Sequence, residues 1–424
     1  MCGIWFSLGF TPDQKHLDVV AHRGPDGQGW RVFDTAQGPL ALGHRRLSII
    51  DLSDAATQPM GSADGRYWVT YNGEIYNYLE LREELAAAGY RFVTSSDTEV
   101  LLAAYTHWGE AALDRLVGMF AFVLWDNHSQ TVFAARDRFA IKPLYFHTNS
   151  HGVAFASEIK QLVALPNFTA RLDLARGYDF LSAGIMDHTT GTMFDAVGQL
   201  QGGECVRLDL RNWRAGQELP VRRWYGIVEP GTLEVGERQA SEQFRELLAQ
   251  SVRLHLRSDV PVGSCLSGGL DSSSIVCLMA RELASVSQDA HVHCVSACYD
   301  VKAVDERPYM EMVVERTDST PHWCYPKVDE AFALAERITW HQDEPYGSTS
   351  IFAQWCVFEE ARRSGLKVML DGQGADEQLA GYHGCFPYYF ANLIRQRRFA
   401  TLLRAMAERH AWHNVSFWDQ VQSS

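Results

Sequence analysis

The chain begins Met1-Cys2-Gly3, so removal of one residue would expose a cysteine that carries both a thiol and a free α-amine. Such a residue is a nucleophile with its own general base. An α-amine has a reference pKa of about 7.7–8.0 and can take the thiol proton near neutral pH. The alternative is an incidental small residue after the initiator methionine. The motifs of the next hundred residues favour the nucleophile.

Thiol attack on an amide also needs oxyanion donors and charged partners for an amino-acid substrate. Asn72 and Gly73 are predicted to form a turn, from which a side-chain amide and a main-chain N–H could face a developing oxyanion. Arg46 could bind an α-carboxylate through two parallel hydrogen bonds. Glu74 and Asp97 could hold an α-ammonium. Each has a structural alternative: the Asn-Gly pair as a hairpin turn alone, Asp97 as a helix cap alone.

A second group of residues lies in a glycine- and serine-rich loop. A predicted strand over 259–266 leads into Ser267-Gly268-Gly269-Leu270-Asp271-Ser272-Ser273, and a helix is predicted over 274–284. Glycines let the backbone approach an anion, which serine hydroxyls and a helix N-terminus attract. The loop lacks the Gly-Lys-Ser/Thr ending of a Walker A motif, so it favours a pyrophosphate group over a γ-phosphate. Asp271 is placed to hold Mg²⁺ against those phosphates.

A second acidic loop, Asp371-Gly372-Gln373-Gly374-Ala375-Asp376-Glu377, follows a predicted strand over 367–370. In an open parallel sheet, the loops after the carboxyl ends of the strands converge on one ligand crevice. We therefore expect both loops to share one nucleotide. The same rule places the end of the predicted strand over 293–297 near its adenine.

The elements that must position these residues divide into two predicted domains and a linker. Residues 1–210 read as strands in runs with separate helices, which is typical of a layered α+β domain. Residues 211–237 are richer in glycine, proline and charge and form the predicted linker, and residues 238–424 alternate helix and strand as in a parallel α/β sheet. In the first domain we expect strands over 117–124 and 131–135, and helices over 78–88 and 97–107, the second capped by Ser95-Ser96.

Composition limits the classes of partner. The 424 residues carry a formal net charge of -14 and are 46% apolar. An acidic chain argues against nucleic acid or an anionic membrane as partner. No run approaches the roughly 18 apolar residues of a membrane span, and a signal peptide is not expected. Nine scattered cysteines suit the reducing cytoplasm, where we expect the protein.

Taken together, the motifs of the first half resemble the class II glutamine amidotransferases, and specifically those fused to an asparagine-synthetase domain. The resemblance implies the αββα sandwich of N-terminal-nucleophile hydrolases, in which the processed cysteine attacks the glutamine side-chain amide and releases ammonia. It implies Cys2 as nucleophile, Asn72 and Gly73 as oxyanion hole, and Arg46, Asn72, Glu74 and Asp97 as glutamine-binding residues. The ordered motifs that carry it are Cys2-Gly3-Ile4, His22-Arg23-Gly24-Pro25-Asp26, His44-Arg45-Arg46-Leu47-Ser48, Asn72-Gly73-Glu74-Ile75-Tyr76-Asn77, Ser96-Asp97 and Gly118-Met119-Phe120-Ala121-Phe122.

The second half resembles the PP-loop ATP pyrophosphatase fold of asparagine synthetases. There ATP adenylates a carboxylate, ammonia displaces AMP, and pyrophosphate leaves. The resemblance implies ATP and Mg²⁺ as cofactors, with Asp271 and Asp376 as metal ligands. It implies ATP binding by Leu266, Ser267, Gly268, Gly269, Asp271, Ser272 and Gly372. Asp343-Glu344-Pro345 also looks like a family motif, without an assigned role.

Two departures from the family pattern bear on the acceptor. Gln373 stands where glutamine-dependent asparagine synthetases commonly carry a glutamate thought to act as a base, and glutamine cannot accept a proton in that way. Family members usually continue well past the Gly381-Tyr382 region, so the second domain is expected to be C-terminally incomplete.

The leading hypothesis is a glutamine-hydrolysing, ATP-dependent asparagine synthetase that acts on aspartate through β-aspartyl-AMP. A second enzymatic reading changes the acceptor to a carboxylate of a peptide, sugar or secondary metabolite. A third is a non-catalytic or ammonia-only scaffold, which the intact Ser267–Ser273 loop disfavours. Homodimers are common in the family.

Overall fold

The strand that follows Cys2 lies inside the first of two large sheets. The computed structural model describes residues 1–227, 234–286, 291–302, 304–413 and 415–416. All six residues of β1 (Gly3–Leu8) are buried, as expected for a short apolar run in the middle of a sheet. The strand order of this sheet is β10-β8-β9-β1-β3-β2. Its other members are β2 (Gly27–Thr35), β3 (Gly38–Arg46), β8 (Tyr145–Thr148), β9 (Val153–Ala156) and β10 (Gly198–Gln199).

A second sheet packs against the first through an apolar layer that includes Phe6 of β1 and Trp125 of β6. The strand order is β12-β11-β7-β6-β5-β4, and every pairing is antiparallel. Its last strand falls within the segment predicted as a linker. The members are β4 (Met60–Gly61), β5 (Tyr67–Ile75), β6 (Gly118–Asp126), β7 (Thr131–Arg136), β11 (Glu204–Asp209) and β12 (Val221–Arg223).

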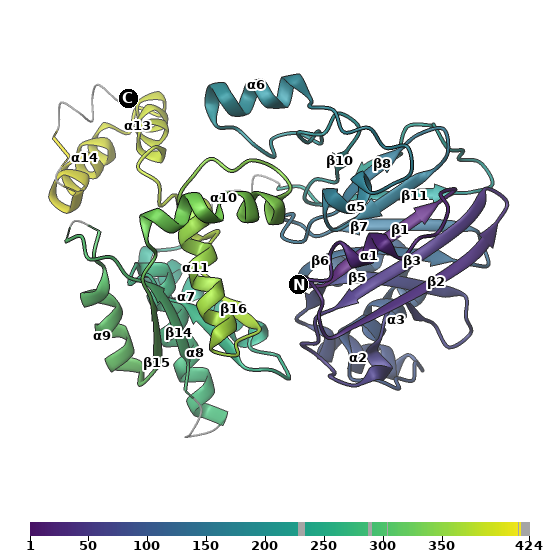
Figure 1. Ribbon diagram of the computed structural model, residues 1–424. Coiled ribbons are helices and arrows are strands. Elements are labelled where there is room, and N and C mark those ends of the chain that lie inside the picture. Colours follow the sequence, from purple (N-terminus) through teal and green to yellow (C-terminus); the bar gives the residue numbers. More distant parts are fainter. Residues whose placement is uncertain (228–233, 287–290, 303, 414, 417–424) are drawn as a thin grey trace.

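Helices cover the outer faces of both sheets, which confirms the predicted αββα sandwich (Figure 1). Helices α1 (Lys15–Asp18) and α5 (Ile159–Val163) pack on the first sheet, and α2 (Tyr78–Ala87) and α3 (Asp97–Trp108) on the second. The side chain of Ser96 caps α3, as predicted, by accepting from the Thr98 N–H. The remaining helices of this domain are α4 (Ala112–Arg115) and α6 (Leu174–Ala183), with 3₁₀ turns at Asp54–Ala56 and Gly109–Ala111.

The second domain is built on a parallel sheet, as predicted, and its four strands have the order β15-β14-β13-β16. Adjacent residues of β14 face opposite layers, since Cys294 packs toward α7, α8 and α9 while Val295 packs toward α11. Helix α8 begins inside the glycine-serine motif, earlier than predicted, so Asp271 lies in its first turn. The strands are β13 (Val262–Cys265), β14 (His293–Ala297), β15 (Thr320–Cys324) and β16 (Val368–Leu370).

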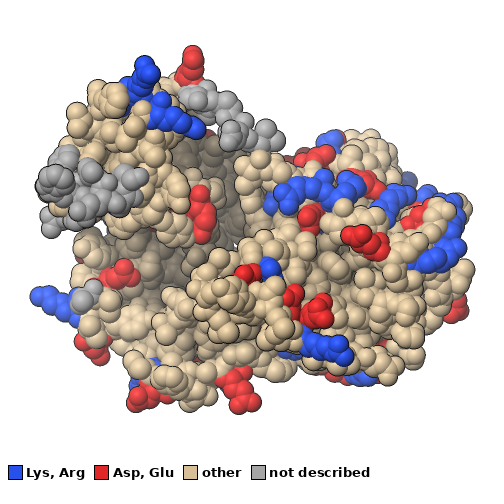
Figure 2. Space-filling view, turned by 90° about the horizontal axis from the view of Figure 1, so that it is seen from above, with Lys and Arg blue, Asp and Glu red and all other residues tan. Residues whose placement is uncertain are grey.

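The helices of the second domain are α7 (Glu237–His255), α8 (Leu270–Val286), α9 (Arg307–Thr317), α10 (Val328–Gln342), α11 (Ser350–Arg363), α12 (Ala375–Leu379), α13 (Cys385–Arg395) and α14 (Phe399–His413). None of the helices described is both long and apolar enough to cross a bilayer. Acidic and basic side chains are interspersed on the face seen in Figure 2.

Two adjacent carboxylates after α10 join the domains. Asp343 Oδ2 accepts from the Ile159 N–H at 2.7 Å, and Asp343 Oδ1 lies 2.8 Å from Lys160 Nζ. Glu344 Oε1 accepts from the Met193 N–H at 2.5 Å. Both acidic residues are buried, although burial raises the pKa of each and opposes their charge. The motif that had no assigned role therefore anchors the second domain on the first.

We predict that Asp343→Ala destabilises the protein by about 3 kcal/mol, because it leaves the Lys160 ammonium and the Ile159 N–H without this acceptor in a buried interface. Asp343→Asn should cost less, since its amide oxygen still accepts from the main chain. Calorimetric unfolding of both variants checks this. Equal melting temperatures for Asp343→Ala and wild type would contradict the anchor.

Candidate functional site

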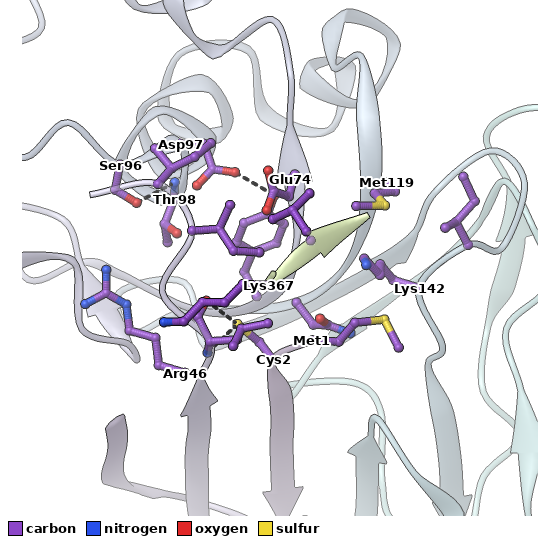
Figure 3. Close-up of a pocket in the computed structure, with 18 of the residues that line it drawn as sticks. Met1, Cys2, Arg46, Glu74, Ser96, Asp97, Thr98, Met119, Lys142 and Lys367 are labelled. Atoms are coloured by element: carbon purple, nitrogen blue, oxygen red, sulfur yellow. Dashed lines mark hydrogen bonds between the residues drawn. The ribbon is translucent and has the colours of Figure 1, made fainter. Parts of the chain in front are cut away.

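A cavity of about 560 Å³ lies where the two domains meet, beside the start of β1 (Figure 3). The first domain contributes all of the residues predicted for the amidotransferase site: Cys2, Arg46, Asn72, Gly73, Glu74 and Asp97. The second domain contributes side chains from α11 and the segment that ends in β16, among them Phe358, Leu366, Lys367 and Met369. The predicted amidotransferase residues are thus brought together in one pocket.

Cys2 is held by a side-chain donor at its carbonyl and by a main-chain contact at its thiol. Arg23 Nε donates to the Cys2 carbonyl at 2.8 Å, and Arg23 Nη1 donates to Glu158 at 2.9 Å. The Leu47 N–H lies 3.4 Å from Cys2 Sγ, and the thiol lies 3.7 Å from the Leu47 carbonyl. Burial raises the pKa of the thiol, although the Leu47 contact works in the opposite direction. The thiol therefore needs a base before it can attack.

Asn72 and Gly73 lie inside β5 opposite Ala121 and Phe120, so the prediction of a turn at this pair is wrong. The flanking apolar residues continue the antiparallel ladder, which overrides the local turn preference. A Cβ on Gly73 would lie 2.3 Å from the Met119 carbonyl, so only glycine fits. The Asn72 amide nitrogen is buried and has no hydrogen-bond partner among the described residues. A buried donor that lines the cavity is suited to an oxyanion.

Two carboxylates lie on one side of the cavity. Asp97 Oδ2 accepts from the Tyr71 hydroxyl at 2.8 Å and from the Ile75 N–H at 3.0 Å, so this residue is more than a helix cap. Burial and, next, the Asp97 charge raise the pKa of Glu74 to about 8. The positive charge of a ligand ammonium would favour ionised Glu74 and so oppose both causes of the raised pKa. The pair thus suits a positively charged group.

Arg46 lies on the other side of the cavity and is largely held by main-chain oxygens. It donates to the carbonyls of Ser53 and Asp51, the first at 2.6 Å. These contacts fix the guanidinium at the cavity wall. Its proposed bond to an α-carboxylate remains a prediction.

Two cavity lysines were not identified from the sequence. Lys142 is buried, and its desolvation lowers its pKa to about 8. A charged residue between Ile141 and Pro143 in an otherwise apolar run was the available signal. Lys367 belongs to the other domain, and its place in this cavity depends on how the domains dock, which no local pattern reveals.

A second pocket, of about 720 Å³, lies at the carboxyl ends of the parallel strands. The glycine-serine loop closes on itself there: the Ser267 N–H donates to Ser272 Oγ at 3.2 Å, and the Gly269 N–H donates to Ser267 Oγ at 3.3 Å. Gly268 is not among the lining residues, but its φ of +78° forms the turn. The predicted nucleotide residues that do line the pocket are Leu266, Ser267, Gly269, Asp271, Ser272, Gly372 and Asp376.

Asp271 and Asp376 come from different loops and line this same pocket. Mg²⁺ is usually bound by one or two carboxylates together with substrate phosphates. The two residues fit that donor set. Gln373 lines the pocket as well, and so does Ala297 at the end of β14, as the prediction for the adenine end requires.

Two family models match successive parts of the chain. A family model described as a glutamine amidotransferase domain matches residues 1–223, and one described as asparagine synthase matches residues 243–422. Asparagine synthetase [glutamine-hydrolyzing] 1 of Bacillus subtilis is 35% identical over 387 residues, covering 89% of this chain and 57% of that protein. A putative asparagine synthetase [glutamine-hydrolyzing] 2 of Methanocaldococcus jannaschii is 31% identical, and the match covers 93% of this chain and 78% of that protein.

A relative with a different name is similar at the same level. Amidase chyE of Penicillium rubens is 32% identical over 387 residues, covering 87% of this chain and 54% of that protein. The chain thus spans little more than half the length of the relatives from B. subtilis and P. rubens.

We predict that glutamine, the expected ligand, binds the Cys2→Ala variant more tightly as pH rises from 6 towards 8. Glu74 has a raised pKa of about 8, so it is mostly protonated in this range and must lose its proton to pair with the ligand ammonium. The dissociation constant should fall by up to about tenfold per pH unit. Titration calorimetry measures it. A dissociation constant that does not change with pH would contradict the pairing of Glu74 with the ligand ammonium. The same pH dependence in a matched Glu74→Gln variant would contradict it too.

Proposed function

The chain belongs to the glutamine-hydrolysing asparagine synthetase family, and on that premise we propose that it amidates a carboxylate with ammonia taken from glutamine, at the expense of ATP. Aspartate is the proposed acceptor and asparagine the product. The observation that carries the proposal is the meeting of two groups in one cavity that residues of the second domain help to line. They are the Cys2 thiol and the Asn72 amide nitrogen, which has no partner in the described part of the chain.

In the proposed first reaction, loss of Met1 exposes the α-amine of Cys2. Burial and then Arg23 lower the pKa of the Met1 α-amine to about 5, so this part of the protein disfavours a charged amine. A neutral amine can accept the thiol proton, and the thiolate then attacks the glutamine amide carbon. The amide nitrogen takes that proton and leaves as ammonia. Water hydrolyses the remaining thioester to glutamate and restores the thiol.

Asn72 and Gly73 would stabilise the tetrahedral intermediates of this reaction. The buried Asn72 N–H₂ loses little on binding an oxyanion, because it gives up no other partner among the described residues. Glu74 and Asp97 on one side of the cavity and Arg46 on the other complement the two charges of an amino acid.

In the proposed second reaction, the acceptor carboxylate attacks the α-phosphorus of ATP and displaces pyrophosphate. The closed loop of Ser267, Gly269 and Ser272 supports binding of that pyrophosphate group at the start of α8. Asp271 and Asp376 would hold Mg²⁺, which neutralises phosphate charge when bound. Ammonia then attacks the acyl-adenylate and releases AMP. A cytoplasmic location and a homodimer remain part of this proposal.

Two observations favour retaining a second candidate for the carboxylate that accepts ammonia. Gln373 lines the proposed nucleotide pocket and has no proton-accepting carboxylate, and a relative named as an amidase is 32% identical to this chain, against 31% and 35% for two relatives named as asparagine synthetases. Both are compatible with a carboxylate other than that of aspartate.

We predict that Cys2→Ala abolishes glutamine-dependent product formation and leaves ammonia-dependent pyrophosphate release within about twofold of wild type, since Cys2 and the residues proposed to bind the nucleotide line separate pockets. Glutamate, amide product and pyrophosphate are measured with either nitrogen source. Loss of both activities in a folded variant would contradict separate sites, and retained glutamine use would remove Cys2 as nucleophile.

A further inference from the structure

Lys367 is a residue of the second domain that lies in the Cys2 cavity of the first. Figure 3 shows it between Arg46 and the beginning of the yellow-green strand β16, close to Cys2. Its Nζ lies 2.9 Å from Asp26 Oδ2, so the ion pair crosses the domain interface. We propose that Lys367 is a positioning residue of the amidotransferase site, acting through Asp26 on the segment that contacts the Cys2 thiol.

Asp26 connects the lysine to that segment. Its Oδ2 accepts from the Ser48 N–H at 2.9 Å as well as from Lys367, and its own N–H donates to the Arg46 carbonyl at 3.0 Å. Leu47 lies between Arg46 and Ser48 in the sequence, and its N–H lies 3.4 Å from Cys2 Sγ. A single carboxylate therefore joins the second domain to the main chain beside the nucleophile.

The loop before Asp26 has little freedom to absorb a displacement. A Cβ on Gly24 would lie 2.3 Å from the Arg45 carbonyl carbon and 2.4 Å from the Arg46 nitrogen. The loop thus packs directly on the backbone that leads to Leu47. Movement of Asp26 must be transmitted to that backbone.

Lys367 is itself firmly placed, because it immediately precedes β16. This strand pairs with β13 from Val368 to Leu370, and Asp371 and Gly372 at its other end line the nucleotide pocket. Three strand residues span about 10 Å. The lysine is therefore presented by the same short strand that carries part of the nucleotide site.

The Lys367–Asp26 ion pair is partly exposed to solvent, which distinguishes a positioning role from a stabilising one. The side chains of Lys367 and Asp26 are 37% and 27% exposed. Ion pairs in such surroundings contribute little to stability. Removal of the lysine charge should therefore change the geometry at Cys2 with little effect on the melting temperature.

The test rests on the proposed glutaminase reaction and uses the mature full chain without ATP. We expect Lys367→Met to lower kcat/KM for glutamine hydrolysis about tenfold, because the catalytic geometry depends on small displacements. Lys367→Arg should restore most of it. In an Asp26→Asn background, Lys367→Met should cost less than about twofold, since the pair is already broken.

Arg257→Met is the matched control. Arg257 also crosses the interface, pairing with Glu80 at 2.5 Å and donating to the Tyr76 carbonyl at 2.6 Å, but none of these three residues lines the Cys2 cavity. We expect unchanged kcat/KM in this variant. Equal losses in Arg257→Met and Lys367→Met, or independent effects of Lys367→Met and Asp26→Asn, would overturn the proposal.

Alkylation of Cys2 by iodoacetamide, followed by mass spectrometry of the N-terminal peptide, gives a readout that does not need turnover. Burial raises the pKa of the Cys2 thiol and the Leu47 N–H opposes that rise, so displacement of this N–H in Lys367→Met should move the alkylation profile to higher pH. A profile identical to that of wild type would overturn the role of Lys367. Absence of glutamine hydrolysis in wild type would instead overturn the proposed function, and alkylation would still decide the positioning role.

Discussion

The docking of the two domains depends on carboxylates buried against main-chain N–H groups. Asp343 and Glu344 bind the N–H groups of Ile159 and Met193, and Lys160 supplies the nearest compensating charge. Burial alone would disfavour the ionised carboxylates, so the interface is stable only while these donors are aligned. That alignment places the start of β16 at the Cys2 cavity.

The same network extends to the nucleophile. Lys160 also binds Glu158, which accepts from Arg23, and Arg23 in turn donates to the Cys2 carbonyl. Burial raises the pKa of Glu158, whereas its hydrogen bond to His22 and the charges of Arg23 and Lys160 lower it. The lowering effects prevail, and the pKa of this carboxyl is about 2. Cys2 is thus fixed by charges that belong partly to the domain interface. Burial raises the pKa of its thiol, so the proposed attack would need the α-amine as a base.

Much of the site could be predicted because its motifs are local. The thiol at Cys2, the cap at Ser96 and the Ser267–Ser273 loop each combine a residue type with a short spacing that has few other uses. Asn72-Gly73 was placed in a turn because local preference favours one, whereas pairing with β6 keeps it in a strand. Lys367 and the anchors Asp343 and Glu344 could not be found in this way, since their roles arise from contacts between residues more than 150 positions apart.

The most direct measurement incubates the purified chain with glutamine, Mg·ATP and aspartate and follows glutamate, asparagine and pyrophosphate together. We predict that all three appear, with asparagine and pyrophosphate in equal amounts and no more asparagine than glutamate. Glutamate without asparagine or pyrophosphate would contradict the claim that the two sites of this chain act together on aspartate.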